Sequence, residues 1–269
     1  MQKFKSVFKV DKPIIGMIHL LALPGTPKFN TTINEIIDAA LHEAEIYLDA
    51  GIDALALENM HDIPYLKNDV GHEISSIMSI IAHKVKKMSS LPCGIQVLSS
   101  ANKAALAIAN NAGLDFIRAE GFVFGHIADE GYIDADAGEL LRYRKAIDAE
   151  HIAVFTDIKK KHSSHALTAD TDIVETAKAA EFFLSDGLIV TGLSTGKEAN
   201  IDEIKSIKKA CQIPVIVGSG ITIDNVAQYL PSSDALIVGS YFKKNGYWAN
   251  APEKDKIAAF MDTVNVLRT

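Results

Sequence analysis

Carboxylate, ammonium and imidazole groups follow one another in a short segment of the chain. Asp157 precedes a run of three lysines that ends at Lys161, and His162 comes next. General acid–base catalysis needs such groups near one substrate, where each tunes the pKa of the others. We therefore predict that Asp157, Lys161 and His162 are catalytic. A Schiff base is not expected, because it usually needs a desolvated lysine and a lysine run gives little sign of one.

Two further titratable side chains, His19 and Glu58, close apolar runs elsewhere in the chain. Glu58 is the alternative to Asp157 as the catalytic base, and His162 or Lys161 would act as the acid or as an electrostatic stabiliser. If variants of the first three residues kept full activity, the chemistry would move to Glu58 and His19. Other polar residues at run ends are expected to contact the substrate: Asn59, Arg118 and Glu120.

A metal site is another use for these acidic and imidazole groups. His19, Glu58 and Asp157 are the candidate ligands, but no H-x-x-x-H or C-x-x-C spacing accompanies them. We therefore expect neither a metal nor any other cofactor.

Glycine-rich turns follow the last two apolar runs. They read Val-Gly-Ser-Gly at 217–220 and Val-Gly-Ser at 238–240. Glycine lets the backbone approach an anion closely, and these are the loops that often bind phosphate in α/β barrels. Tight turns without a ligand are the alternative, but their pairing favours phosphate against the amides of Gly220 and Ser240. The glycines and serines expected at this site are Gly192, Gly218, Ser219, Gly220, Gly239 and Ser240.

Eight short apolar runs recur along the chain, with stretches of helical spacing between them. They are Ile14–His19, Ala54–Glu58, Gly94–Leu98, Phe116–Arg118, Ile152–Thr156, Leu188–Val190, Val215–Val217 and Ala235–Val238. Most are continuous, as expected of parallel strands covered on both faces. Thr32 with Glu35 predicts a capping box at the first helix after them.

This alternation predicts an α/β protein, a single (β/α)8 or TIM barrel domain over residues 1–269. An open doubly wound sheet is the competing architecture. It is disfavoured because no G-x-G-x-x-G follows the first run.

The composition of the chain excludes some classes of binding partner. The net charge is −7 and no basic stripe is present, which argues against nucleic acid. No apolar run reaches the ~20 residues of a membrane span, and residues 1–12 lack the apolar stretch of a secretory signal peptide, so none is expected. Cys93 and Cys211 are expected to be buried free thiols, which fits a cytoplasmic protein.

The segment 121–137 is the longest stretch without clear periodicity. Such loops are usually functional, and glycines at 121, 125 and 131 provide hinges for a mobile lid over the barrel mouth. A fixed loop in a homo-oligomer interface is the alternative. In either case Phe122 and Phe124 are expected to pack over a ligand or against a partner subunit.

Motifs along nearly the whole chain resemble those of the BtpA/SgcQ family of TIM-barrel proteins. They include GMIHL (16–20), LPG (23–25), FIR (116–118), ELLRYR (139–144), VGSG (217–220) and IVGS (237–240). Cyanobacterial members of that family are associated with photosystem I accumulation, and others occur beside sugar-phosphotransferase genes. Glu120 stands where many members carry Asn, and the lysine run is extended. Both departures imply that the substrate differs from that of other members.

These observations predict an enzyme acting on a small phosphorylated metabolite, such as a sugar phosphate or a nucleotide. Isomerase, epimerase or lyase chemistry suits an acid–base pair opposite a phosphate anchor, which supplies binding energy that positions the reacting end. The alternative is a non-catalytic assembly or regulatory factor that senses a phosphorylated ligand.

Overall fold

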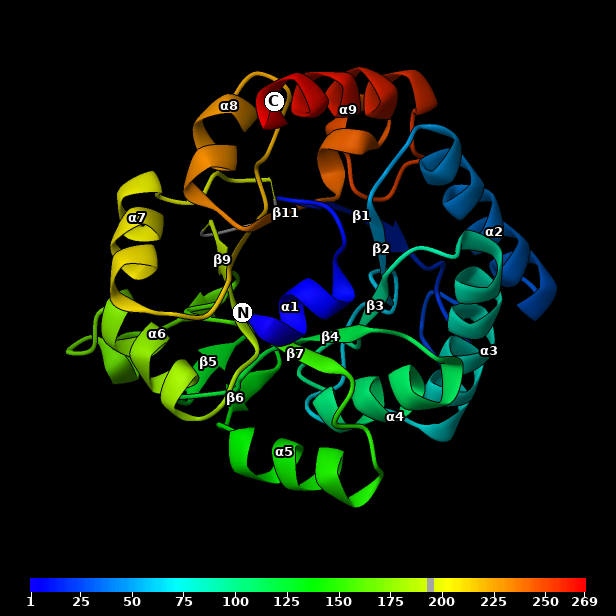
Figure 1. Ribbon diagram of the computed structural model, residues 1–269. Helices are drawn as coiled ribbons and strands as arrows, with labels where there is room; N and C mark the ends of the chain where they lie inside the picture. The colour runs from blue at the N-terminus through cyan, green and yellow to red at the C-terminus, as the bar shows by residue number, and fades with distance from the viewer. Residues whose placement is uncertain (193–195) are drawn as a thin grey trace.

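The apolar runs form parallel strands that close on themselves. In the computed structural model, which describes residues 1–192 and 196–269, eight such strands make up a closed barrel (Figure 1). They are β1 (Ile14–His19), β2 (Ala54–Glu58), β3 (Cys93–Gln96), β4 (Phe116–Ala119), β7 (Ala153–Asp157), β9 (Gly187–Thr191), β10 (Val215–Gly218) and β11 (Ala235–Val238). The predicted TIM barrel is therefore confirmed.

Strands that are neighbours in the chain are neighbours in the barrel. The order is β1-β11-β10-β9-β7-β4-β3-β2, and pairing of Ile14 with Leu236 closes the ring. The ends of several strands differ from the prediction. The third predicted strand extends too far, because the Leu98 amide donates to the Asn59 side chain at 2.7 Å instead of to a neighbouring strand.

Helices cover the outside of the barrel (Figure 1). They are α2 (Ile33–Asp49), α3 (His72–Ser89), α4 (Asn102–Ala112), α5 (Ala137–Ala146), α6 (Ile173–Phe182), α7 (Ile201–Ala210), α8 (Val226–Tyr229) and α9 (Lys254–Arg268). The predicted capping box of α2 is confirmed, since the Thr32 side chain accepts from the Glu35 amide and the Glu35 carboxylate accepts from the Thr32 amide. No helix in the described part of the chain is long and apolar enough to cross a membrane. Both cysteines are buried free thiols, as predicted.

The barrel interior is apolar at its N-terminal end and is closed there by the first helix, α1 (Gln2–Val7), which lies across its centre in Figure 1. Phe4 and Phe8 insert among Phe116 and Phe155, with ring centroids 5.6 Å apart for Phe8 and Phe116 and 6.0 Å apart for Phe4 and Phe155. Gly94 makes this possible, because a Cβ there would lie 2.1 Å from the Phe116 ring. The bottom of the barrel is therefore sealed.

The segment after β4 is not irregular, as the sequence suggested, but folds into a hairpin. Strands β5 (His126–Ala128) and β6 (Gly131–Ile133) pair antiparallel, and β5 also pairs with β8 (Ser163–Ser164). Strands this short carry little periodicity. Phe122 is fully buried in the core instead of facing a ligand or partner, whereas Phe124 is exposed. Lid motion and a homo-oligomer interface stay predictions.

The aromatic seal predicts a large stability cost for its removal. We expect Phe8→Ala to lower the free energy of unfolding by about 3 kcal/mol, since a buried phenyl is replaced by a cavity. Denaturant unfolding measures the change, with Phe182→Ala, whose side chain is 81% exposed, as the matched control. A loss no larger than that of the control would show that α1 is not part of the core.

Candidate active site at the barrel mouth

Charged side chains point into the barrel at its C-terminal end, because side chains alternate between the two faces of each strand. Met17, Ala56, Phe155 and Ile237 belong to the apolar interior of the barrel. Because side chains alternate between the two faces of a strand, the residue two positions further along each strand also points inward, and it reaches the mouth. These residues are His19, Glu58, Gln96, Arg118, Asp157, Thr191, Gly218 and Gly239. The interior thus changes from apolar to charged within one layer of side chains.

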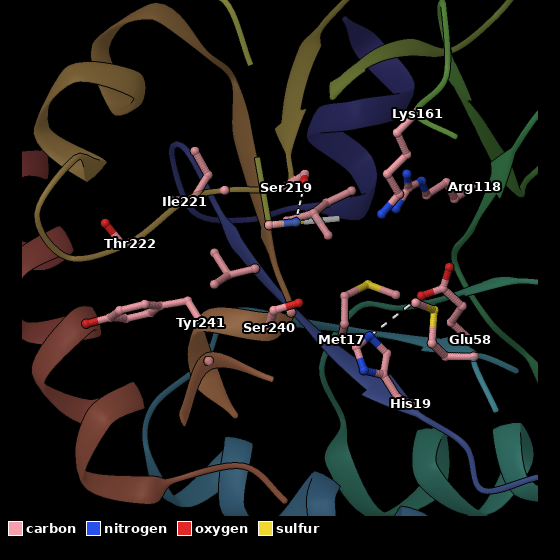
Figure 2. Close-up of a pocket in the computed structure, with 17 residues that line it drawn as sticks. Met17, His19, Glu58, Arg118, Lys161, Ser219, Ile221, Thr222, Ser240 and Tyr241 are labelled. Atoms are coloured by element: carbon pink, nitrogen blue, oxygen red, sulfur yellow. Dashed lines mark hydrogen bonds and ion pairs between the residues drawn. The ribbon is translucent and has the colours of Figure 1, made fainter. Parts of the chain in front are cut away.

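A cavity of about 170 Å³ opens at this end. Predicted site residues that line it are His19, Glu58, Arg118, Lys161, Ser219, Gly220, Gly239 and Ser240. Figure 2 shows Glu58, Arg118 and Lys161 on one side of the cavity and the two serines on the other. The structure thus places the acid–base candidates opposite the glycine-rich turns.

Asp157 forms a buried ion pair with Arg118. The arginine donates Nε–H to one carboxylate oxygen at 2.7 Å and Nη2–H to the other at 2.8 Å. Both oxygens are therefore occupied, and Asp157 does not line the cavity. The geometry gives Asp157 the task of holding Arg118 in place, which differs from the free base that the sequence suggested.

Glu120 is likewise held away from the cavity. Its carboxylate lies 3.2 Å from the Lys160 ammonium and accepts from the Ser100 amide at 3.1 Å. Burial raises its pKa, but Lys160 and Arg118 outweigh burial and leave the pKa below its ordinary value. Glu120 is therefore an ionised partner of Lys160, and its contact with a substrate stays a prediction.

Asn59 and His162 also lie outside the cavity lining. Asn59 donates to Asp62 at 2.8 Å and accepts from the Leu98 amide, so it joins the loops after β2 and β3. His162 is exposed on the loop after β7. The geometry gives Asn59 a structural task and leaves the catalytic role of His162 a prediction.

Two of the predicted glycines are required for close loop packing. A Cβ on Gly192 would lie 2.2 Å from the Lys197 carbonyl oxygen, and one on Gly220 would lie 2.5 Å from the Glu198 amide nitrogen. Gly220 also has a φ of +69°, which favours glycine. The loops after β9 and β10 therefore touch beside the cavity. Residues 193–195 of the first loop lie outside the described part of the chain.

His19 and Glu58 face each other across 3.6 Å (Figure 2). His19 Nδ1 lies 2.8 Å from the Trp248 carbonyl, which only accepts, so Nδ1 carries the proton and Nε2 presents a lone pair. Burial, reinforced by nearby Lys243, lowers the pKa of His19 to about 3. The imidazole is therefore neutral and in one tautomer.

Burial also raises the pKa of Glu58, although Arg118 and Lys161 oppose the shift. Glu58 thus holds its proton to higher pH than an exposed glutamate does. A carboxyl group with a raised pKa is better suited to exchange a proton with a substrate than an exposed glutamate is. Among the described residues, Glu58 is the only carboxylate that lines the cavity.

Two residues at the mouth, Gln96 and Lys243, were given no role in the site from the sequence. Gln96 pairs in register with Glu58, and its Oε1 is buried without a hydrogen-bond partner among the described residues. Its place at a strand end was a usable signal. Lys243 is fully buried and forms an ion pair with the partly exposed Glu43 at 2.6 Å, and burial lowers the pKa of Lys243. No sequence spacing indicated this pair.

Metal ligation finds no support in the described residues, which contain no cluster of three or more His, Cys, Asp or Glu side chains suited to a metal ion. The candidate ligands His19 and Glu58 do lie together. The third candidate, Asp157, is engaged by Arg118.

Comparison with known proteins agrees with the sequence motifs. The model of the BtpA family matches residues 10–266. The chain belongs to the BtpA family. A Caenorhabditis elegans protein described as mitochondrial is 45% identical over 96% of this chain and 95% of its own. The photosystem I biogenesis protein BtpA of Synechocystis is 31% identical over 96% of this chain and 89% of its own. The cytoplasmic location stays a prediction.

Solved structures with the same fold include several enzymes. An orotidine 5'-monophosphate decarboxylase from Methanocaldococcus jannaschii has a TM-score of 0.62 at 14% identity, covering 95% of this chain and all of that one. An N-acetylmannosamine-6-phosphate 2-epimerase from Clostridium perfringens has a TM-score of 0.55 at 13% identity, covering 88% and 90%. At such identities the likeness of this BtpA-family chain shows the fold alone.

The neutral state of His19 predicts acid sensitivity. Between about pH 6.5 and pH 3 an unfolded histidine binds a proton that folded His19 does not, so its contribution to stability is lost as the pH falls. We expect His19→Asn, whose amide can keep the bond to Trp248, to reduce the slope of unfolding free energy against pH by up to about 1.4 kcal/mol per unit. Chemical unfolding from pH 4 to 7.5 measures it.

The control is His151→Asn, because His151 is exposed. Equal slopes for the His19 and His151 variants would contradict a buried, neutral His19.

Proposed function

We propose that this BtpA-family protein is an enzyme that binds a small phosphorylated metabolite at the barrel mouth and moves a proton next to its carbonyl group. One observation carries the proposal: a single cavity is lined by the His19–Glu58 pair, by Arg118 and Lys161, and by both glycine-rich turns. Isomerisation, epimerisation and carbon–carbon lysis all begin with such a proton transfer. The reaction class is therefore isomerase or lyase.

The turns after β10 and β11 supply the phosphate anchor. Ser240 opens a short 3-10 helix, η3 (Ser240–Phe242), in which the Phe242 amide makes the first internal bond, to Gly239. The amides of Ser240 and Tyr241 precede that bond, so they have no acceptor within the turn. Ser219 and Gly220 both adopt left-handed conformations on the opposite turn. Backbone N–H groups presented in this way suit a phosphate dianion.

The fold neighbours support the same ligand class. The decarboxylase, the epimerase and a phosphoribosylanthranilate isomerase from Pyrococcus furiosus (TM-score 0.56, 12% identity, covering 95% of this chain and 99% of that one) are all named for phosphate-bearing compounds. A cavity of about 170 Å³ is smaller than the ~300–1,000 Å³ of typical drug-sized sites. This size favours a sugar phosphate over a nucleotide.

Glu58 is the proposed acid–base group. Its carboxylate form takes a proton from the carbon beside the substrate carbonyl, and its acid form returns a proton to the product. Arg118, held by Asp157, stabilises the negative charge that develops on the carbonyl oxygen. Neutral His19 presents Nε2 to Glu58 and keeps its carboxyl group oriented. Asp157 therefore acts through Arg118.

A factor that senses a phosphorylated ligand without turnover is the second candidate function. One observation favours it, the identity of 31% to a protein named for photosystem I biogenesis. Both candidate functions include the phosphate anchor, so a measurement of turnover is needed to distinguish them.

The anchor predicts direct binding of inorganic phosphate. We expect millimolar phosphate to raise the melting temperature of the protein, and Ser240→Asp to abolish the rise because a carboxylate then occupies the anion position. Ser6→Asp adds the same charge at the sealed end of the barrel and should leave the rise intact. A rise that survives Ser240→Asp would place the phosphate elsewhere.

The proton-transfer role predicts a large effect of Glu58→Gln, which keeps shape and removes the base. In a screen of phosphosugars followed by proton–deuterium exchange, we expect the substitution to lower turnover about 10²–10⁴-fold while phosphate binding persists. Glu45→Gln, an exposed change on α2, is the control. Ligand binding with no turnover in the unmodified protein would favour the sensing factor.

A further inference from the structure

Lys161 differs from the other lysines of its run in what surrounds its ammonium group. Lys160 is paired with Glu120, and Lys159 donates to the Thr168 carbonyl at 3.3 Å. Lys161 lines the cavity, and within the described residues it has no carboxylate within 4.0 Å and no hydrogen-bond acceptor. A half-buried lysine that enters a binding cavity without a counter-charge contributes no ion pair or hydrogen bond of its ammonium group to the fold.

Two nearby carboxyl groups, those of Asp157 and Glu58, could form an ion pair with Lys161, but neither is free to do so as a carboxylate. Asp157 gives both of its oxygens to Arg118. Glu58 lies in the same cavity, where burial favours its protonated form. Figure 2 shows Lys161 extending beside the Arg118 guanidinium, a fixed positive charge.

These surroundings favour the neutral amine. Burial lowers the pKa of Lys161, and Arg118 lowers it further, while Glu58, Asp157 and Glu120 oppose the shift. A neutral amine is a nucleophile toward carbonyl carbon, and desolvation beside another cation is a known way to produce one.

We propose that Lys161 is a catalytic nucleophile that forms an imine with the carbonyl group of the phosphorylated substrate, an inference that rests on the proposed function. The phosphate turns hold one end of the substrate, and Lys161 approaches from the other side of the cavity. The substrate class is thereby narrowed to phosphorylated aldehydes and ketones.

The step balances with the groups present. The Lys161 amine adds to the carbonyl carbon, and its proton moves to the oxygen, giving a carbinolamine. The C–O bond then breaks as Glu58 donates its proton, so that water leaves and a protonated imine remains. The Glu58 carboxylate next takes a proton from the adjacent carbon, which yields a neutral enamine and restores the acid. Hydrolysis of the imine after reprotonation releases the product and the free amine.

Reductive trapping tests the imine. The intact protein is treated with dihydroxyacetone phosphate and sodium borohydride, and the modified lysines are located by peptide mass spectrometry. We expect one saturable adduct on Lys161, weaker with dihydroxyacetone, prevented by inorganic phosphate and lost in Lys161→Arg. Lys159→Arg, which changes a lysine outside the cavity lining, keeps the adduct. The pH dependence of trapping should have its midpoint below the ordinary lysine value of 10.5.

The outcomes separate the imine from the phosphate anchor. Equal labelling of surface lysines such as Lys205, or no label on Lys161, would overturn the imine. If inorganic phosphate still raised the melting temperature in that case, the anchor would stand. A label on Lys161 that phosphate neither prevents nor competes with would support the imine and refute the anchor. Phosphate stabilisation of Lys161→Arg shows that this variant is folded.

Discussion

A buried arginine needs a fixed counter-charge, and the bidentate pair of Arg118 with Asp157 meets this need at the level where the barrel interior changes from apolar to charged. Leaving either charge unpaired would cost several kcal/mol. The pair consumes the carboxylate that would otherwise neutralise Lys161, and it keeps a positive charge near Glu58. Burial is the larger cause of the shifted pKa values of Glu58 and Lys161, and the fixed charge of Arg118 acts on both groups in addition.

The fold could be predicted from the sequence because its signals are local. Each strand is a continuous apolar run, so strand count and order were readable even where strand ends were not. The closure of the barrel by α1 could not be predicted, because alternating Lys and Phe in a short segment does not show which residues the phenyl rings will contact. Strands β5, β6 and β8 were not predicted either, because each is only two or three residues long and carries little periodicity.

The sequence could predict which residues lie near the site from their positions at strand ends, but it could not predict which of them form ion pairs with one another. Placement at a strand end selected Glu58, His19 and Arg118 correctly as residues near the cavity. The same criterion could not show that Asp157 would be held by a residue on a neighbouring strand. The sequence favoured Lys161 over Lys160 as the catalytic lysine, but it could not show that Lys161 lines the cavity while Lys160 pairs with Glu120.

Closure of the ring has a consequence for synthesis. The edge of β1 stays without its second neighbour until β11, near the end of the chain, leaves the ribosome. Throughout that interval a nearly complete sheet presents open backbone groups on β1, and open strand edges can pair with other chains during misassembly. The last strand therefore completes the barrel and removes its open edge.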